Sequence, residues 1–483
     1  MALTKVTSGV RTLGTGEVTS ANLAAGAVDT SGLEDDIALL GFRVASNGSL
    51  AKYNLVDQTV DDFQDTSGVD ASTSTDDIRE SSGKYYSGTT VVAGGQTAFT
   101  TVETTSWTAP TGLTTVTYLV VGGGGGAGSG GNGTYGGGGG GAGGLRTGTL
   151  SVTGDASYTV TVGAGGAGGP SGSSGSGSNG SSGSASVFST ITSAGGGAGS
   201  YKYGPYGSSG GSGGGGTNDQ GALSGNTPST SPSQGNNGGV GTGSQGGGGG
   251  GSGGVGSNGN SPTDYGGNGG AGTNLSATFG TGVGQSGWFA GGGGGGHKGD
   301  STGGWGNGGN GNLGGGGNAY LTSSATGGGS DAIDGTGGGG GGGSVRRQND
   351  TGDSSGGDGG NGTVIVKWDA INIYNNMTLV STTTAAQAAP TKGDIVLTYT
   401  NGAGTTTLDT DLTAEISADG GSTWTALALG SEGSTGAHNI ATAHDVTITS
   451  TITAPYNMAY RIKTLNQAVG KTTRIHAVSL GWS

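Results

Sequence analysis

Residues 122–144 read GGGGGAGSGGNGTYGGGGGGAGG, and similar runs recur as far as Gly362. The longest uninterrupted runs span residues 122–126, 136–141, 246–251, 291–296 and 337–343. Most residues of this block have no side chain to bury, and glycine loses more backbone entropy on ordering than any other residue. The block is therefore either a flexible linker or a structure held together by backbone packing alone.

Backbone packing of this kind requires the polyglycine analogue of the polyproline II helix. That helix has three residues per turn, rises roughly 3.1 Å per residue and makes no internal hydrogen bonds. Without a Cβ, neighbouring helices can approach closely and bond to one another through every N–H and C=O. A six-glycine run would form a straight segment of roughly 19 Å. We expect such segments to form a glycine sandwich, with the intervening polar residues as loops.

The competing interpretation is a linker, because Gly and Ser without a strict period usually indicate disorder. The block is longer than a linker needs to be, and it contains aromatic residues, in which disordered segments are poor. We favour the ordered interpretation. The aromatic residues concerned are Tyr201, Tyr203, Tyr206, Tyr265, Trp288, Phe289, Trp305 and Tyr320.

Composition excludes several classes of protein. The 483 residues suggest about three domains, and only 29% of them are hydrophobic. The chain has no cysteine, which excludes disulfides and thiolate sites. A net charge of −14 argues against a basic patch for nucleic acid or anionic membranes. No apolar run reaches membrane-spanning length, and Met1–Lys5 leads into no signal-peptide core. We expect synthesis in a host cytoplasm, no membrane insertion, and export only through assembly into a particle.

The first 96 residues contain little core-forming sequence. In residues 1–50, Ser31 and Glu34 form a capping-box pattern, and Leu33, Ile37 and Leu40 follow on one face of a predicted short helix. This stripe either packs on its own chain or serves attachment and self-association. Residues 51–96 are acidic and rich in Ser and Thr, without the spacing of a calcium loop. We expect a solvated, extended connector there and no metal.

The remaining sequence predicts two β modules. Residues 97–121, 150–153, 158–162 and 363–368 have strand character, so residues 97–368 are predicted to form one small antiparallel sheet module. The glycine-rich region, about 122–362, would be inserted between its strands. Residues 369–483 contain short strands at regular spacing, with a hairpin turn at 419–421, which predicts a β-sandwich. The fold class expected is all-β.

No motif carries catalytic or cofactor chemistry. Gly-x-Gly-x-x-Gly matches occur by chance in such a block, and 291–298 lacks the Gly-Lys-Ser/Thr of a phosphate loop. The four histidines lack zinc-ligand spacing. We assign no cofactor, no metal and no enzymatic activity. The eight aromatic residues of the block are the candidate receptor-binding residues, since exposed rings stack on sugars or anchor in a partner's pocket. Alternatively, they cap the ends of the glycine segments.

Three stretches carry a resemblance. They are Met1-Ala-Leu-Thr-Lys5, the lead-in Thr108-Ala-Pro-Thr-Gly112 with Val116-Thr-Tyr-Leu-Val-Val followed by five glycines, and the exit Gly360-Asn-Gly-Thr-Val-Ile-Val-Lys367. Over most of residues 1–368 the chain resembles glycine-rich tail-fibre and structural proteins of tailed bacteriophages, particularly marine ones. Related adhesins of T-even-like phages pack polyglycine II helices into a sandwich whose variable loops bind host receptors.

The resemblance implies a virion tail-fibre protein that binds the host receptor, with attachment to tail or baseplate proteins through the N-terminal segment. Its partner at the cell surface would be a polysaccharide or an outer-membrane protein. Phage fibres are commonly trimers, and a homotrimer would partner the Leu33/Ile37/Leu40 stripe. The alternatives are a non-adhesive virion decoration or connector and, less favoured, a polysaccharide depolymerase. The depolymerase would usually need paired carboxylates, and the glycine block has almost none before Asp300.

Overall fold

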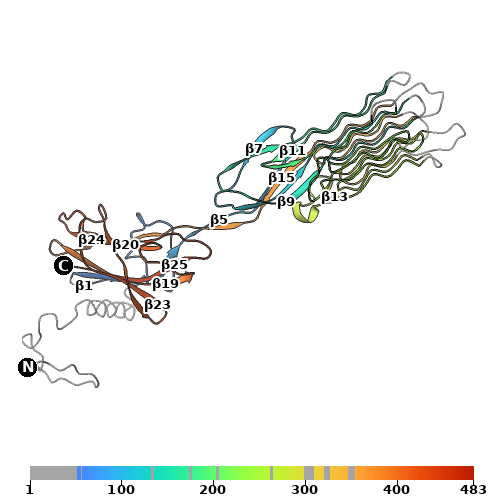
Figure 1. Cartoon of the computed structure of the whole chain (residues 1–483). Helices are drawn as coiled ribbons and strands as arrows, with labels where there is room; N and C mark the ends of the chain where they lie inside the picture. The colour runs from blue at the N-terminus through green and yellow to red at the C-terminus, as the bar shows by residue number, and fades with distance from the viewer. Residues whose placement is uncertain are drawn as a thin grey trace, which may run out of the picture. The chain divides into compact units, whose positions relative to one another are not determined.

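The computed structural model describes residues 52–55, 57–131, 135–172, 177–202, 206–260, 265–298, 309–319, 327–345 and 354–483 (Figure 1). The described chain forms two compact units. The glycine-rich unit is Val92–Ile371, and the sandwich unit combines the described residues up to Val91 with Asn372–Ser483. The fold is almost entirely β, as predicted, and its strands pair antiparallel. The predicted N-terminal helix, with Leu33, Ile37 and Leu40, lies outside the described residues.

The glycine-rich unit is built on two four-stranded sheets. One has the order β6-β15-β8-β9 and the other β12-β11-β10-β7. Their facing side chains, including Trp107, Tyr118 and Phe188, form one buried cluster, so the expected single sheet is in fact a two-sheet sandwich. The strands are β6 (Gly95–Phe99), β7 (Thr104–Thr108), β8 (Thr115–Val121), β9 (Leu145–Ser151), β10 (Ser157–Thr161), β11 (Ser186–Phe188), β12 (Ile191–Ser193) and β15 (Thr363–Trp368).

The glycine-rich block is an ordered insertion between β8 and β15, as the sequence predicts. These two strands pair side by side, with Val121 opposite Thr363, so the chain leaves and re-enters the sheet at one place. Between them the backbone runs back and forth as closely spaced extended segments, which we call rods (Figure 1). Short elements near the sheets interrupt the rods: β13 (Thr273–Asn274), α2 (Ser276–Phe279) and β14 (Trp288–Phe289).

The rod 122–131 shows how the insertion is held together. Its amides donate in strict rotation to three neighbouring rods, at N···O distances of 2.8–3.0 Å. This three-residue period is that of a polyglycine II helix. Gly122, Gly125 and Gly128 donate to the rod 135–144; Gly123, Gly126 and Ser129 to 177–185; and Gly124, Ala127 and Gly130 to 354–362.

The carbonyls of the same rod accept from three further rods, 163–172, 194–202 and 336–345. The rod 122–131 therefore has six neighbours, three through its donors and three through its acceptors. The rods 135–144 and 290–298 are likewise bonded to six neighbours each. A threefold helix directs its groups outward at regular angles, so a lattice with six neighbours around each rod satisfies every backbone group inside it.

The interior positions exclude any side chain. A Cβ placed on Gly140 would lie 2.0 Å from the carbonyl oxygen of Gly125, and one on Gly124 would lie 1.8 Å from that of Gly338. All five of the longest glycine runs are buried throughout. The uninterrupted runs are therefore the rods, or parts of rods, at the centre of the lattice.

The outer rods carry a polar residue at every third position. In 354–362, Ser354, Gly357 and Gly360 are buried, whereas Ser355 and Asp358 are exposed. At the surface of the lattice some amides face no further rod and so have no backbone carbonyl to donate to. Side-chain oxygens of neighbouring outer rods accept from them instead. Four such bonds run between outer rods: Gly168 N to Asp358 Oδ1 (2.6 Å), Gly165 N to Asn361 Oδ1 (3.0 Å), Asp358 N to Asp331 Oδ1 (2.8 Å) and Asn361 N to Asp334 Oδ1 (2.9 Å).

The sandwich unit packs an eight-stranded sheet on a five-stranded sheet, which confirms the predicted β-sandwich. The first contains β1 (Lys52–Leu55), β2 (Gln58–Asp61), β3 (Asp77–Glu80), β4 (Lys84–Ser87), β19 (Lys392–Ala403), β22 (Gly430–Thr435), β23 (His438–Thr447) and β25 (Thr472–Trp482). The second contains β17 (Thr378–Val380), β18 (Thr384–Ala385), β20 (Leu412–Ser417), β21 (Thr425–Leu427) and β24 (Asn457–Thr464). A separate two-stranded sheet pairs β5 (Thr89–Val92) with β16 (Ile371–Tyr374).

The acidic segment 51–96 is not the extended connector that its composition suggests. β2 pairs with β25, placing Thr59 opposite Leu480, and β4 pairs with the same strand further along. Phe63, which is fully buried, packs edge-to-face on Tyr85 at 5.1 Å between ring centroids. The few apolar residues among the carboxylates thus complete the core of a sheet whose other strands begin only at Lys392.

Asp61 is a buried carboxyl group in this added part of the sheet. Its Oδ1 accepts from Phe63 N at 2.8 Å, and Tyr460 Oη donates to its Oδ2 at 3.4 Å. Burial raises the pKa of Asp61 to about 7, from 3.8, against the lowering effects of the Phe63 amide and Lys52. The folded protein therefore holds a proton here that the unfolded chain releases at lower pH.

Replacing an interior glycine should destabilise the lattice strongly. We expect Gly140→Ala to lower the free energy of unfolding of the glycine-rich unit by about 3 kcal/mol, because the new methyl group meets backbone that cannot move aside. Gly221→Ala is the matched control, since a Cβ there has nothing within 4 Å, and should change it by less than about 1 kcal/mol. Denaturant unfolding of both variants provides the measurement. Equal effects at the two positions would contradict the packing described.

The buried Asp61 should make the sandwich unit less stable as pH rises. Between pH 3.8 and about 7 the native state binds more protons than the unfolded state, so the free energy of unfolding falls across that window. Asp61→Asn should flatten this dependence, and the exposed Asp65→Asn should not. Urea unfolding at several pH values compares the three proteins. A pH dependence unchanged by Asp61→Asn would show that the carboxyl group is ionised in the native state.

Candidate binding surface

The rods end together on the side away from the sheets (Figure 1). Backbone bridges connect residues that flank the undescribed segments of this unit, which shows that these flanks share one end. The bridges are Gly131 to Tyr135, Gly130 to Ser354, Lys298 to Val345 and Gly327 to Ser344. We call this end the rod-end surface and define it by Tyr135, Tyr201, Lys202, Tyr206, Gln245, Tyr265 and Lys298.

Two of the predicted aromatic residues are exposed on this surface. Tyr206 is 69% exposed and Tyr265 is 45% exposed. Their backbones are held in place: Asn179 Nδ2 donates to Tyr206 O at 3.4 Å, and Tyr265 bridges to Asn260. These rings thus combine exposure with an ordered support, as a binding residue requires.

Tyr201 behaves differently from its neighbours. It is only 2% exposed, and its ring lies against Gly131 and Gly177 at the end of the lattice. Its amide donates to Asn179 Oδ1 at 2.5 Å. Tyr201 therefore covers rod ends, which is the capping alternative considered from the sequence, and does not present an exposed ring.

Trp288 and Phe289 are not part of the rod-end surface. They form β14, which pairs with β13 beside the sheets. Phe289 is fully buried in a cluster with Leu119 and Ile365, so it is a core residue and the prediction of an exposed ring is wrong for it. Trp288 is half-buried. Sequence proximity to glycine runs could not distinguish the two ends of a rod. Tyr203, Trp305 and Tyr320 lie outside the described residues.

Four further residues of the surface were not candidates from the sequence: Tyr135, Lys202, Gln245 and Lys298. Lys202 Nζ lies 3.0 Å from the centroid of the Tyr135 ring, a cation–π contact. Gln245 makes two hydrogen bonds with the backbone of Lys298: its Oε1 accepts from the amide at 3.0 Å and its Nε2 donates to the carbonyl at 3.4 Å. A search for polar and aromatic residues that directly precede glycine runs would have found Tyr135 and Gln245.

Lys298, which follows the run 291–296 and His297, does not form part of a phosphate loop. His297 is 4% exposed, and its amide donates to Ser344 Oγ at 3.2 Å, so the chain here continues as a rod. Elsewhere, His438 stacks on His476 with ring centroids 4.1 Å apart. Burial lowers the pKa of His476 to about 4, which favours a neutral ring in this pair. The described residues contain no group of three or more His, Asp or Glu side chains placed to hold a metal ion.

Comparison with known families agrees with this architecture. The sequence model described as a glycine-rich domain matches residues 99–369, from the last residue of β6 to just past β15. The chain belongs to the glycine-rich domain family. The match covers the rods together with all but the first residues of the two sheets that anchor them, so the family unit is the sandwich plus its insertion. No curated protein matches the chain.

The glycine-rich domain contains α2, the one helix among the described residues, and it is four residues long. No helix in the described ranges is long and apolar enough to cross a membrane.

Truncation should separate the aromatic residues that stabilise the domain from those that are only displayed. We expect Phe289→Ala and Tyr201→Ala to lower the free energy of unfolding by about 3 kcal/mol each, because each leaves a cavity. Tyr206→Ala should change it by less than about 0.5 kcal/mol. Denaturant unfolding of the three variants tests this. A large loss with Tyr206→Ala would show that its ring is a packing residue.

Proposed function

We propose that this chain is a tail-fibre or receptor-binding protein of a tailed bacteriophage and recognises the bacterial surface through the rod-end surface. The observation that carries the proposal is that one backbone lattice holds exposed Tyr206 and Tyr265 at the same end as the Lys202–Tyr135 pair. The resemblance of the lead-in and exit sequences to phage fibre proteins supports the same role.

The lattice suits recognition because it supplies a fixed support from little sequence information. Backbone bonds hold the rods, so residues between and beside the rods can vary without loss of a side-chain core. Aromatic rings with a polar end favour contact with sugars and with pockets in proteins. The proposed partner is accordingly a surface polysaccharide or an outer-membrane protein, and the proposed role requires no catalysis.

Attachment to tail or baseplate proteins is assigned to the N-terminal segment 1–50, and we propose a homotrimer. Several copies on one particle would multiply a weak single contact by avidity. The protein would be made in the host cytoplasm and would reach the cell surface as part of the virion.

Cell binding tests the proposal directly. We expect the labelled full chain to bind cells of at least one strain in a panel of bacteria, and Tyr206→Ala/Tyr265→Ala to weaken binding by about tenfold or more, since anchoring rings contribute disproportionately. Val255→Ala is the matched control, because Val255 is 65% exposed within the rod region and not on the rod-end surface. Its binding should equal that of the unmodified chain.

Two outcomes would contradict the proposal in different ways. Absence of binding to every strain would favour a non-adhesive decoration or connector of the virion. Undiminished binding by the double variant would place recognition elsewhere on the chain. Release of sugar from purified surface polysaccharide would instead indicate a depolymerase.

A further inference from the structure

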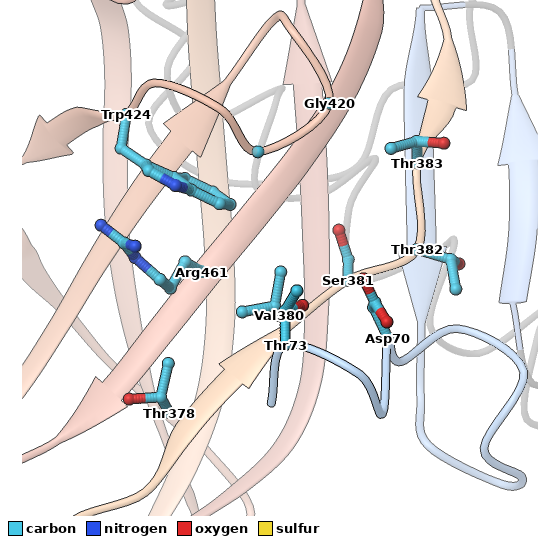
Figure 2. Close-up of a pocket in the computed structure, with 11 residues that line it drawn as sticks. Asp70, Thr73, Thr378, Val380, Ser381, Thr382, Thr383, Gly420, Trp424 and Arg461 are labelled. Atoms are coloured by element: carbon cyan, nitrogen blue, oxygen red, sulfur yellow. The ribbon is translucent and has the colours of Figure 1, made fainter. Parts of the chain in front are cut away.

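The sandwich unit contains a hollow of about 420 Å³ that sequence reasoning did not anticipate. Trp424 and Arg461 lie on one side of it and Asp70 and Ser381 on the other (Figure 2). Volumes of this size accommodate small organic ligands, and such sites combine apolar surface with a few fixed polar groups. The hollow lies wholly within one unit, in a part of the chain remote in sequence from the rods.

Trp424 is held in place by the loop that precedes it. The Asp419 carboxylate accepts from the amides of Ser422 and Thr423, at 3.0 and 2.9 Å, and from Thr423 Oγ1 at 2.6 Å. Gly421, in the left-handed region with φ of +92°, lies against the edge of the indole ring. The loop is thus fixed by its own hydrogen bonds and by a residue type that tolerates this conformation.

Arg461 supports one face of the ring. Its Cζ lies 4.4 Å from the Trp424 centroid, a cation–π contact, and its Nε donates to Glu415 Oε2 at 2.5 Å. Lys463 pairs with the same carboxylate at 2.9 Å. The positive charge beside the hollow is therefore partly neutralised, and Arg461 serves to hold the ring.

The opposite wall is polar and equally fixed. Asp70 Oδ1 accepts from Ser72 N at 2.9 Å and from Ser72 Oγ at 2.6 Å, and these bonds lower the pKa of Asp70, which keeps it ionised at neutral pH. Ser381 Oγ accepts from Tyr460 N at 3.0 Å, which leaves its own proton to donate. Within the part of the chain that the structure describes, the indole N–H of Trp424 has no hydrogen-bond partner.

We propose that this hollow binds one or two residues of a neutral saccharide. The C–H face of a pyranose would pack on the indole, and its hydroxyl groups would donate to Asp70 and accept from Ser381 or the indole N–H. An anionic ligand is disfavoured, because the carboxylate of Asp70 has no cation partner among the described residues and Arg461 is already paired with Glu415. The site does not depend on the proposed role of the rod-end surface, because it lies in the other unit.

Fluorine NMR of the full chain labelled with 5-fluorotryptophan tests the site, since the chain has only six tryptophans. Trp424→Phe assigns the resonance. The probes are the methyl pyranosides of glucose, galactose, mannose and N-acetylglucosamine. We expect at least one of them to shift the Trp424 resonance saturably, with a dissociation constant in the millimolar range.

Asp70→Asn separates binding from folding, because asparagine retains the oxygen that accepts from Ser72. It should weaken binding by about tenfold, whereas the exposed Asp65→Asn should leave binding unchanged. No shift of the Trp424 resonance with any of the four sugars would overturn the proposal. So would an unchanged affinity in Asp70→Asn, or a response to tetramethylammonium without one to sugars. None of these results bears on cell binding by the rod-end surface.

Discussion

Hydrogen bonding between backbones that carry no side chains is the interaction on which the glycine-rich domain depends. At the interior positions a Cβ would lie about 2 Å from a carbonyl carbon or oxygen of the next rod, far inside any tolerated contact. The same closeness allows each amide to reach a carbonyl at ordinary hydrogen-bond length. The entropy lost on ordering so much glycine is offset by satisfying nearly every buried backbone group and by close packing of the rods. Neither benefit is available to one rod alone, so the lattice forms as a whole.

A lattice of this kind needs a starting register and a boundary. The sheets supply the register, because β8 runs directly into the rod 122–131 and the rod 354–362 runs directly into β15, its neighbour in the sheet. Asp, Asn and Ser side chains supply the boundary by accepting from amides that have no further rod to face. Aromatic residues close the remaining gaps: Phe289 packs beneath the sheet and Tyr201 covers the rod ends. In our proposal, recognition is carried out by the exposed rings of Tyr206 and Tyr265, which neither pack on a sheet nor cover a rod end.

The sandwich unit follows the opposite principle. Its core consists of ordinary apolar side chains from strands that are distant in sequence, joined by polar residues buried among them. Such a core fixes the positions of loops as well as strands, and the Trp424 loop is an example, since Asp419 and Arg461 hold it from two sides. The two units of one chain thus reach rigidity by different means, one through backbone alone and one through side chains.

Much of this architecture is determined by local sequence. Uninterrupted glycine permits only disorder or polyglycine II packing, and the flanking alternation at 115–121 and 363–368 indicates a shared sheet. The ordered insertion was therefore predictable. The C-terminal sandwich was predictable as well, from the short strands at regular spacing in 369–483. Other features depend on contacts between distant residues. The acidic segment around Asp61 is a set of strands only because β25 pairs with it, and charge counting cannot detect that partner. Likewise, Tyr206 and Phe289 both lie in the glycine-rich block, yet one is exposed and the other buried, because exposure depends on which end of a rod a residue occupies. That choice is made by the register of the whole lattice and is not encoded in any single run.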